Sequence, residues 1–142
     1  MTAYYMNDAM FDLPDAEFVD RSTTYLWGKT PSGADALILV ERRILDEDEP
    51  LRAAVAQLGH DAKEELRGYS VISERDVEVA GMPAIDVGAR WRDEDGTPMY
   101  TRRVHIALGS SWMIFAGEVP MVDRDFCDAH LEHVIASLQM RE

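Results

Sequence analysis

The sequence predicts an α+β protein in which an antiparallel sheet carries two helices packed on one face, leaving an open concave face on the other side. Stretches of alternating apolar and polar residues are joined by tight turns, as in antiparallel sheets. Two other segments repeat apolar residues every three or four positions, as helices do. No repeat or linker interrupts the 142 residues, so residues 1–142 are expected to form one domain.

Four strands are expected before the first helix, over residues 3–6, 9–12, 23–27 and 36–42. In the third, alternation places Thr23, Tyr25 and Trp27 on one face. The turn sequence Pro31-Ser32-Gly33 joins the third stretch to the fourth, which predicts a hairpin.

The first helix is expected over residues 51–67. Pro50 suits the start of a helix, the acidic residues before it suit the positive end of the helix dipole, and Gly68 suits its end. The apolar stripe of this helix consists of Leu51, Val55, Leu58, Ala62 and Leu66.

A meander of strands and a second helix complete the chain. The strands are expected over residues 69–73, 76–80, 84–91, 99–108 and 112–118, and the helix over residues 123–138. Along the chain, strands, a helix, further strands and a second helix follow one another. This order, with tight turns between the strands, favours an antiparallel sheet with both helices on one face.

This layout leaves apolar side chains without cover. In residues 99–108, alternation directs Thr101, Arg103 and His105 to the open face. Residues 36–42 are apolar on both faces, with Leu37 and Leu39 on the open side. Such a strand needs two covering layers, whereas the predicted helices provide one, so we expect a homodimer or another protein partner.

Composition restricts the remaining possibilities. The net charge of −13 disfavours nucleic acid and anionic membranes, and no apolar run is long enough to insert in a bilayer. The N-terminus lacks the pattern of a signal peptide. The single cysteine, Cys127, cannot form an intrachain disulfide, which is compatible with a reducing compartment. We therefore expect a cytoplasmic protein.

The sequence predicts no catalytic, metal or cofactor site. His130 and His133 are three residues apart but lack the surrounding ligands of a zinc motif. Cys127 lies in an apolar helix stripe and is expected to be a buried structural thiol. The one candidate acid–base pair is His105 with Glu41. We therefore expect that the protein is not an enzyme.

Several short motifs resemble the DcrB-related family, and within it the effector-associated (Eag-type) chaperones of type VI secretion. These motifs are Phe11-Asp12-Leu13-Pro14, Asp20-Arg21-Ser22, Val40-Glu41-Arg42, Val55-x-Gln57-Leu58, Leu66-x-Gly68-Tyr69, Gly81-x-Pro83-Ala84, Trp91, Thr101-Arg102-Arg103, Val119-Pro120 and Phe126. Their joint order over most of the chain carries the resemblance. Glu41, Thr101 and Arg103 depart from the family pattern, which has a small polar residue and two glutamines there.

The resemblance implies a PsbP-like fold, a homodimer and a specific partner. Such a chaperone holds the apolar N-terminal transmembrane helices of a PAAR- or Rhs-type effector in the cytoplasm before the effector is loaded onto the secretion spike. The association of the chaperone itself with the spike is expected to be indirect. The predicted client-binding residues are Thr23, Tyr25, Trp27, Leu37, Leu39, Glu41, Gln57, Thr101, Arg103 and His105. Two alternatives remain open: a non-catalytic accessory DcrB-like domain, and a small-ligand carrier or enzyme that uses the open face.

Overall fold

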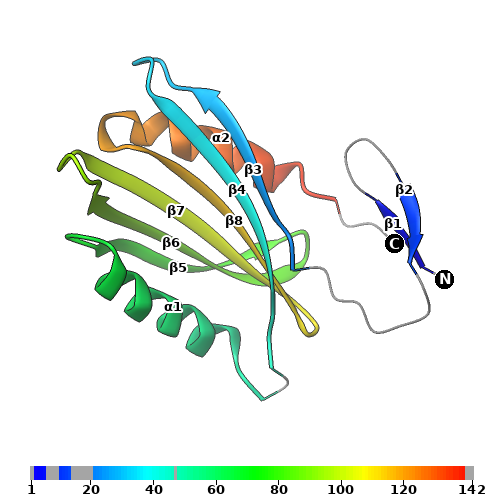
Figure 1. The fold of residues 1–142 in the computed structure, drawn as a ribbon. Coiled ribbons are helices and arrows are strands. Elements are labelled where there is room, and N and C mark those ends of the chain that lie inside the picture. Colours follow the sequence, from blue (N-terminus) through cyan, green and yellow to red (C-terminus); the bar gives the residue numbers. More distant parts are fainter. Residues whose placement is uncertain (1, 6–9, 14–20, 47, 140–142) are drawn as a thin grey trace.

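The computed structural model describes residues 2–5, 10–13, 21–46 and 48–139. Its main element is a six-stranded antiparallel sheet with the strand order β3-β4-β8-β7-β6-β5 (Figure 1). The strands are β3 (Thr23–Lys29), β4 (Asp35–Ile44), β5 (Ser70–Val79), β6 (Met82–Arg92), β7 (Pro98–Leu108) and β8 (Ser111–Pro120). The helices are α1 (Leu51–Glu65) and α2 (Arg124–Ala136). The antiparallel α+β class predicted from the sequence is confirmed.

Two further strands, β1 (Thr2–Tyr5) and β2 (Met10–Leu13), pair with each other in a separate two-stranded sheet. They correspond to the strands expected over residues 3–6 and 9–12, of which residues 6 and 9 lie outside the described part of the chain.

Strand β5 corrects one expectation. The sequence predicted two short strands over residues 69–73 and 76–80, whereas the structure has one strand with an irregular register between Val71 and Ser73. The tight turn after it uses Ala80 and Gly81, both with positive φ (51° and 81°). Two such residues in succession match the right-handed twist of a hairpin, and glycine at the second position lowers the steric strain.

Helix α1 begins directly after Pro50 and ends within two residues of the predicted boundary. Gly68 follows with a φ of +67°, a conformation that a residue with a Cβ adopts at a steric cost. The chain then enters β5, which is one of the two end strands of the six-stranded sheet.

The two helices pack on opposite faces of the sheet, so the prediction that both lie on one face is wrong (Figure 1). Ala54 and Val55 of α1 pack in a cluster with Ile85, Val87, Trp112, Ile114 and Ala116. Leu131 of α2 packs in a different cluster with Ala84, Val104, Ile106 and Phe115. The two clusters use alternating residues of the same strands, which point to opposite sides of a sheet.

Burial of the central strands explains why the helices lie on opposite faces of the sheet. Residues 84–89 of β6 are all buried, including side chains on both faces. Strands with this pattern need a covering layer on each side. One helix on each face meets this need, and the apolar side chains on both faces of β4 reflect the same demand.

A buried ionic network joins α2 to the sheet. The Arg102 guanidinium donates two hydrogen bonds to the Asp86 carboxylate, at 3.0 and 2.7 Å, and also contacts Asp128 and Glu132 of α2. Arg75 donates a further bond to Asp86 at 2.9 Å. Burial raises the pKa of Asp86, but the hydrogen bonds and positive charges of the two arginines outweigh this effect and lower it. Asp86 therefore stays ionised inside the protein.

Replacing Arg102 by methionine should destabilise the fold by about 3 kcal/mol or more, because it removes the main partner of a buried carboxylate. The matched control is Arg52→Met, which removes one partner of the exposed Arg52–Asp76 ion pair and should cost less than about 1 kcal/mol. Urea denaturation of both variants measures the difference. Equal losses of unfolding free energy would contradict the structural role of the network.

Candidate functional site

The face of the sheet that α1 covers, here called the α1-side face, carries nine of the ten predicted client-binding residues. Tyr25 pairs with Leu39 and Trp27 with Leu37 across β3 and β4, and Leu39 pairs with Ala116 of β8. Because paired residues point to the same side, the register places on this face Thr23, Tyr25, Trp27, Leu37, Leu39, Glu41, Thr101, Arg103 and His105. The prediction that these residues share one face is confirmed.

The sequence predicted that this face is open, which is wrong, because α1 covers part of it. His105 is 2% exposed, and Leu39 packs against the cluster beneath α1. Leu39 is therefore partly a core residue. A substitution there would disturb folding as well as the surface, contrary to the assignment of this whole face to partner binding.

A groove of about 790 Å³ remains between α1 and the sheet. Its walls include Val55 and Leu58 of α1 and Val87 and Ala89 of β6. Polar and aromatic groups lining it are His60, Lys63, Tyr69, Ser70, Glu74, Trp91, Thr101, Arg103, His105 and Glu118. Three of the predicted residues, Thr101, Arg103 and His105, thus line this groove.

Gln57 is the exception among the predicted residues. It lies on an exposed part of α1, donates a hydrogen bond to Asp61 at 3.0 Å and is not among the residues that line the groove. The sequence placed it with the others through a family motif, and the helix turns it away from the groove.

Four charged groups that line the groove, Lys63, Glu74, Arg103 and Glu118, have no ion-pair partner among the described residues. Among the described residues, no carboxylate lies within 4 Å of the Arg103 guanidinium, and no basic group lies within 4 Å of the Glu118 carboxylate. Burial raises the pKa of Glu118, although the positive charge of Arg103 acts against this. Thr101 lies opposite Glu118 in the ladder and accepts a hydrogen bond from Trp91 Nε1 at 2.8 Å. The groove therefore combines apolar walls with basic and acidic side chains that have no ion-pair partner among the described residues.

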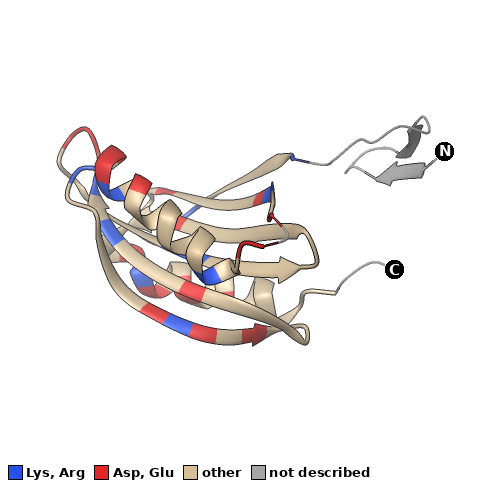
Figure 2. Ribbon diagram, turned by 90° about the horizontal axis from the view of Figure 1, so that it is seen from below, with Lys and Arg blue, Asp and Glu red and all other residues tan. Residues whose placement is uncertain are grey.

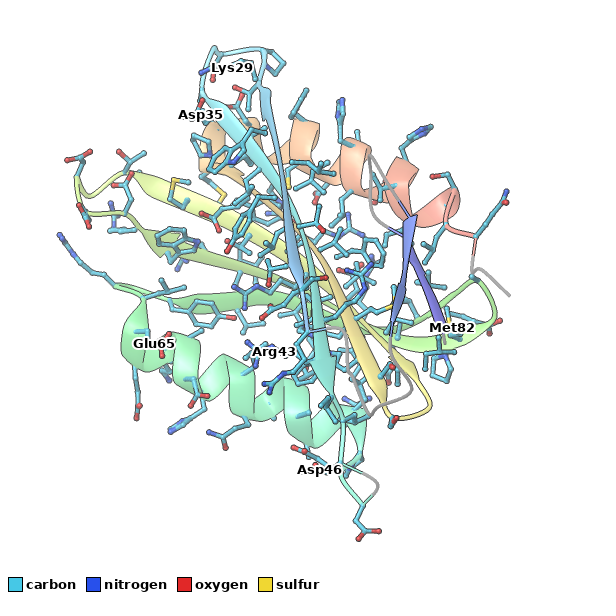
Figure 3. All side chains as sticks on the ribbon, turned by 45° about the vertical axis from the view of Figure 1, so that its right-hand side comes forward. Lys29, Asp35, Arg43, Asp46, Glu65 and Met82 are labelled. Carbon is cyan, nitrogen blue, oxygen red and sulfur yellow. The ribbon has the colours of Figure 1, made fainter. Side chains whose placement is uncertain are left out.

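The floor of the groove holds a neutral histidine. His105 Nδ1 accepts a hydrogen bond from Trp112 Nε1 at 3.2 Å, so its proton is on Nε2. Burial lowers the pKa of His105 to about 3, and the positive charges of Arg103 and Arg43 contribute. Arg43 projects from β4 on the side of α1, where its guanidinium lies 5.5 Å from the Trp112 ring centroid (Figure 3).

His105 and Glu41 are not brought together as an acid–base pair. Each lies opposite Ile114 of β8, one on each side of it, so two strand spacings, or about 10 Å, separate their backbones. Glu41 instead bonds Arg43 at 2.9 Å.

The α1-side face continues beyond the groove to exposed aromatic residues on β3. Tyr25 is 59% exposed and Trp27 is 69% exposed, while Leu37 beside them is half-buried. Cys127 is buried, as the sequence predicted, and burial raises its pKa to about 12. Within the described part of the chain, no three His, Cys, Asp or Glu side chains are grouped to hold a metal ion.

Sequence reasoning missed several residues of the groove, chiefly Glu118, Trp91 and Tyr69. Glu118 could have been predicted from the sequence, because alternation along β8 places it on the same face as Trp112, Ile114 and Ala116. Trp91 and Tyr69 were noticed as family motifs only, and both line the groove between α1 and the sheet.

A model of the DcrB family matches residues 8–137, which is most of the chain. The chain belongs to the DcrB family. No curated protein matches its sequence. The more specific resemblance to effector-associated chaperones stays a prediction.

Solved structures show that this DcrB-family protein shares its fold with PsbP-like proteins. It is similar to PA94 from Pseudomonas aeruginosa, a protein of unknown function, with a TM-score of 0.85 and 22% identity over 99% of this chain and 97% of that one. LpqN of Mycobacterium tuberculosis, involved in cell envelope biogenesis, has a TM-score of 0.61 and 12% identity, covering 89% and 80%. PsbP (CyanoP) of Synechocystis sp. PCC 6803 has a TM-score of 0.59 and 11% identity, covering 82% of each chain. The predicted PsbP-like fold is confirmed.

Neither helix in the described residues has the length and apolarity needed to cross a membrane.

The buried neutral His105 predicts a pH dependence of stability. Its pKa is about 3 in the folded protein and about 6.5 when unfolded, so below pH 6.5 the unfolded chain binds a proton that the folded chain excludes. Stability should fall as the pH drops through this window. Between pH 7 and pH 5, the wild type should lose about 2 kcal/mol more than His105→Asn, which keeps an acceptor for Trp112.

Urea denaturation at the two pH values measures this difference. The other titrating groups are common to both proteins, so their contributions cancel in the comparison. An identical pH dependence in wild type and variant would show that His105 accepts a proton in the folded protein.

Proposed function

We propose that this DcrB-family protein is a cytoplasmic, non-catalytic chaperone that binds and shields the N-terminal transmembrane helices of a type VI secretion effector. The observation that carries the proposal is the continuous surface formed by the groove, the half-buried Leu37 and Leu39, and the exposed Tyr25 and Trp27. Exposed apolar patches of this kind mark sites of protein interaction.

The dimensions of the face suit a transmembrane helix. A helix of about 20 residues is about 30 Å long. Strands β4 and β7, with 10 and 11 residues, extend about 33–36 Å at 3.3 Å per residue. A client helix laid along the strands, beside α1, would be covered over its whole length.

The polar groups of the groove suit the same client. Within membranes, helices recognise one another through close packing and hydrogen bonds of small polar side chains. Thr101, Arg103 and Glu118 offer such partners among apolar walls. The long stem of Arg103 also allows its methylene groups to pack on the client while the guanidinium bonds a polar atom.

The overall charge is consistent with a holding role. A net charge of −13 keeps a complex with an apolar client dispersed and disfavours nucleic acid and anionic lipid as competing partners. The proposal needs no cofactor. Association with the secretion spike is then indirect, through the client.

The direct experiment is co-expression with the neighbouring effector gene. We expect the apolar N-terminal region of the effector to remain in solution and to co-purify with the chain, whereas that region alone precipitates. If the effector precipitates in the presence of the chain, the accessory-domain alternative replaces the chaperone proposal.

Replacing Trp27 by glutamate should lower client retention about tenfold or more, because a carboxylate without a partner against an apolar helix is strongly unfavourable. The fold should be unaffected, since Trp27 is 69% exposed. Val122→Glu is the matched control, because Val122 is 85% exposed and does not line the groove. Pull-down of the effector fragment, with circular dichroism on each variant, measures both effects. Equal retention by the two variants would exclude β3 from the client site.

A further inference from the structure

Two opposite charges, Arg103 and Glu118, lie in the middle of the α1-side face and are here called the central pair. Strand pairing sets Arg103 of β7 opposite Ala116 of β8. It sets Glu118 of β8 opposite Thr101 of β7. The two charges are therefore on adjacent strands and two residues apart along them, with about 7–8 Å between their Cα atoms. Their neighbours across the sheet are apolar, namely Leu37, Leu39, Val87 and Ala89.

The charges at the rim of the groove differ from the central pair. Lys63 of α1 is exposed. So are three residues of β5, at the border of the sheet, whose charges alternate in sign (Figure 2): Glu74, Arg75 and Asp76. Groups at the rim stay in water when a partner occupies the groove. The central pair is half-buried and would lie beneath a helix that fills the groove along the strands.

Both members of the central pair are hydrated before a client binds. Neither side chain has an ion-pair or hydrogen-bond partner in the described part of the chain. Every described buried polar side-chain atom does have a partner, so the polar atoms of the central pair are open to solvent. A client helix excludes that water. A purely apolar client would leave a cation and an anion with neither water nor a partner, which is strongly unfavourable.

We propose that the client helix carries a carboxylate, from aspartate or glutamate, that faces Arg103, and a hydrogen-bond donor about one turn away that faces Glu118. The inference rests on the proposed function, because it concerns the client of the same groove. A guanidinium binds a carboxylate through two parallel hydrogen bonds, and a carboxylate accepts hydrogen bonds from amide, hydroxyl and ammonium groups. The central pair would thus select its client by charge as well as by apolar surface.

The spacing within the central pair matches a helix that runs along the strands. Two residues of a strand extend about 6.7 Å, and four residues of a helix extend about 6.0 Å. Side chains four residues apart also differ by about 40° around the helix axis, so they reach adjacent strands. The donor is therefore expected four residues from the carboxylate, before or after it according to the direction of the client helix.

The charge of the whole protein works against such a client. A net charge of −13 repels an acidic helix at long range. A preference for an acidic helix must therefore come from a local cation, and Arg103 is half-buried in the groove whereas Lys63 is exposed. Arg103→Glu and Lys63→Glu change the net charge equally, so the second variant is a matched control for the first.

Model clients on a soluble carrier test the carboxylate. Each carrier ends in a helix of about 20 leucine and alanine residues, with either leucine or aspartate at its centre, and is co-expressed with the tagged full chain. The wild type should retain the aspartate helix about tenfold more than the leucine helix. Arg103→Glu should reverse this order, whereas Lys63→Glu should keep it. Comparing variants against the same two helices cancels the effect of aspartate on the client alone, and circular dichroism checks that each variant is folded.

A second pair of model clients tests Glu118. Both helices have a central aspartate and two glutamines, which lie four positions to each side of the aspartate in one helix and two positions to each side in the other. The composition is identical, but only the four-position glutamines share the helix face of the aspartate. The wild type should retain that helix about fivefold more. Glu118→Ala should remove the difference, and equal retention by the wild type would contradict the role of Glu118.

Failure of the inference and failure of the proposed function give different results. If the wild type retains the leucine helix as well as the aspartate helix, the central pair does not select the client and the inference is overturned, while apolar helices are still shielded. The same holds if Arg103→Glu and Lys63→Glu behave alike. If the chain retains none of the model helices, the proposed function and the inference both fail.

Discussion

The burial of the central strands on both faces is the constraint on which the rest of the structure depends. Residues 84–89 of β6 are wholly buried, and β7 and β8 bury side chains on both sides. Each face therefore needs a cover, and the chain has one helix for each. Helix α2 packs over Val104, Ile106 and Phe115, whereas α1 leaves a groove and the β3 side of its face uncovered. The candidate site is the part of the sheet that the fold leaves without a cover.

The surroundings of polar side chains also differ between the two faces of the sheet. Under α2, Arg102 and Asp86 are buried together, and every described buried side-chain polar atom in the protein has a hydrogen-bond partner. Such a network, once formed, holds α2 in a single position because a missing partner is costly. Under α1, His105 is kept neutral, and among the described residues Arg103 and Glu118 have no ion-pair partner at the wall of the groove. The first arrangement suits a closed interior, and the second suits a surface that receives a partner.

The uncovered face and the β3 edge meet at the same residues. Tyr25 and Trp27 lie on the α1-side face through their side chains and on the outer edge through their backbone. The charged β5 edge, on the other side of the groove, sets the limit of this surface.

The sequence by itself determined the local structure. Helical spacing between Leu51 and Leu66 predicted α1, and period-two alternation predicted most strands and the common face of Tyr25, Leu39 and His105, because these patterns follow from backbone geometry. It did not determine which face each helix covers. Val104 and His105 are both buried, and only tertiary packing decides that α2 meets the first and α1 the second. Tyr69 was overlooked as a groove residue for the same reason: a groove forms where separate elements meet, and its walls depend on long-range packing that no local pattern records.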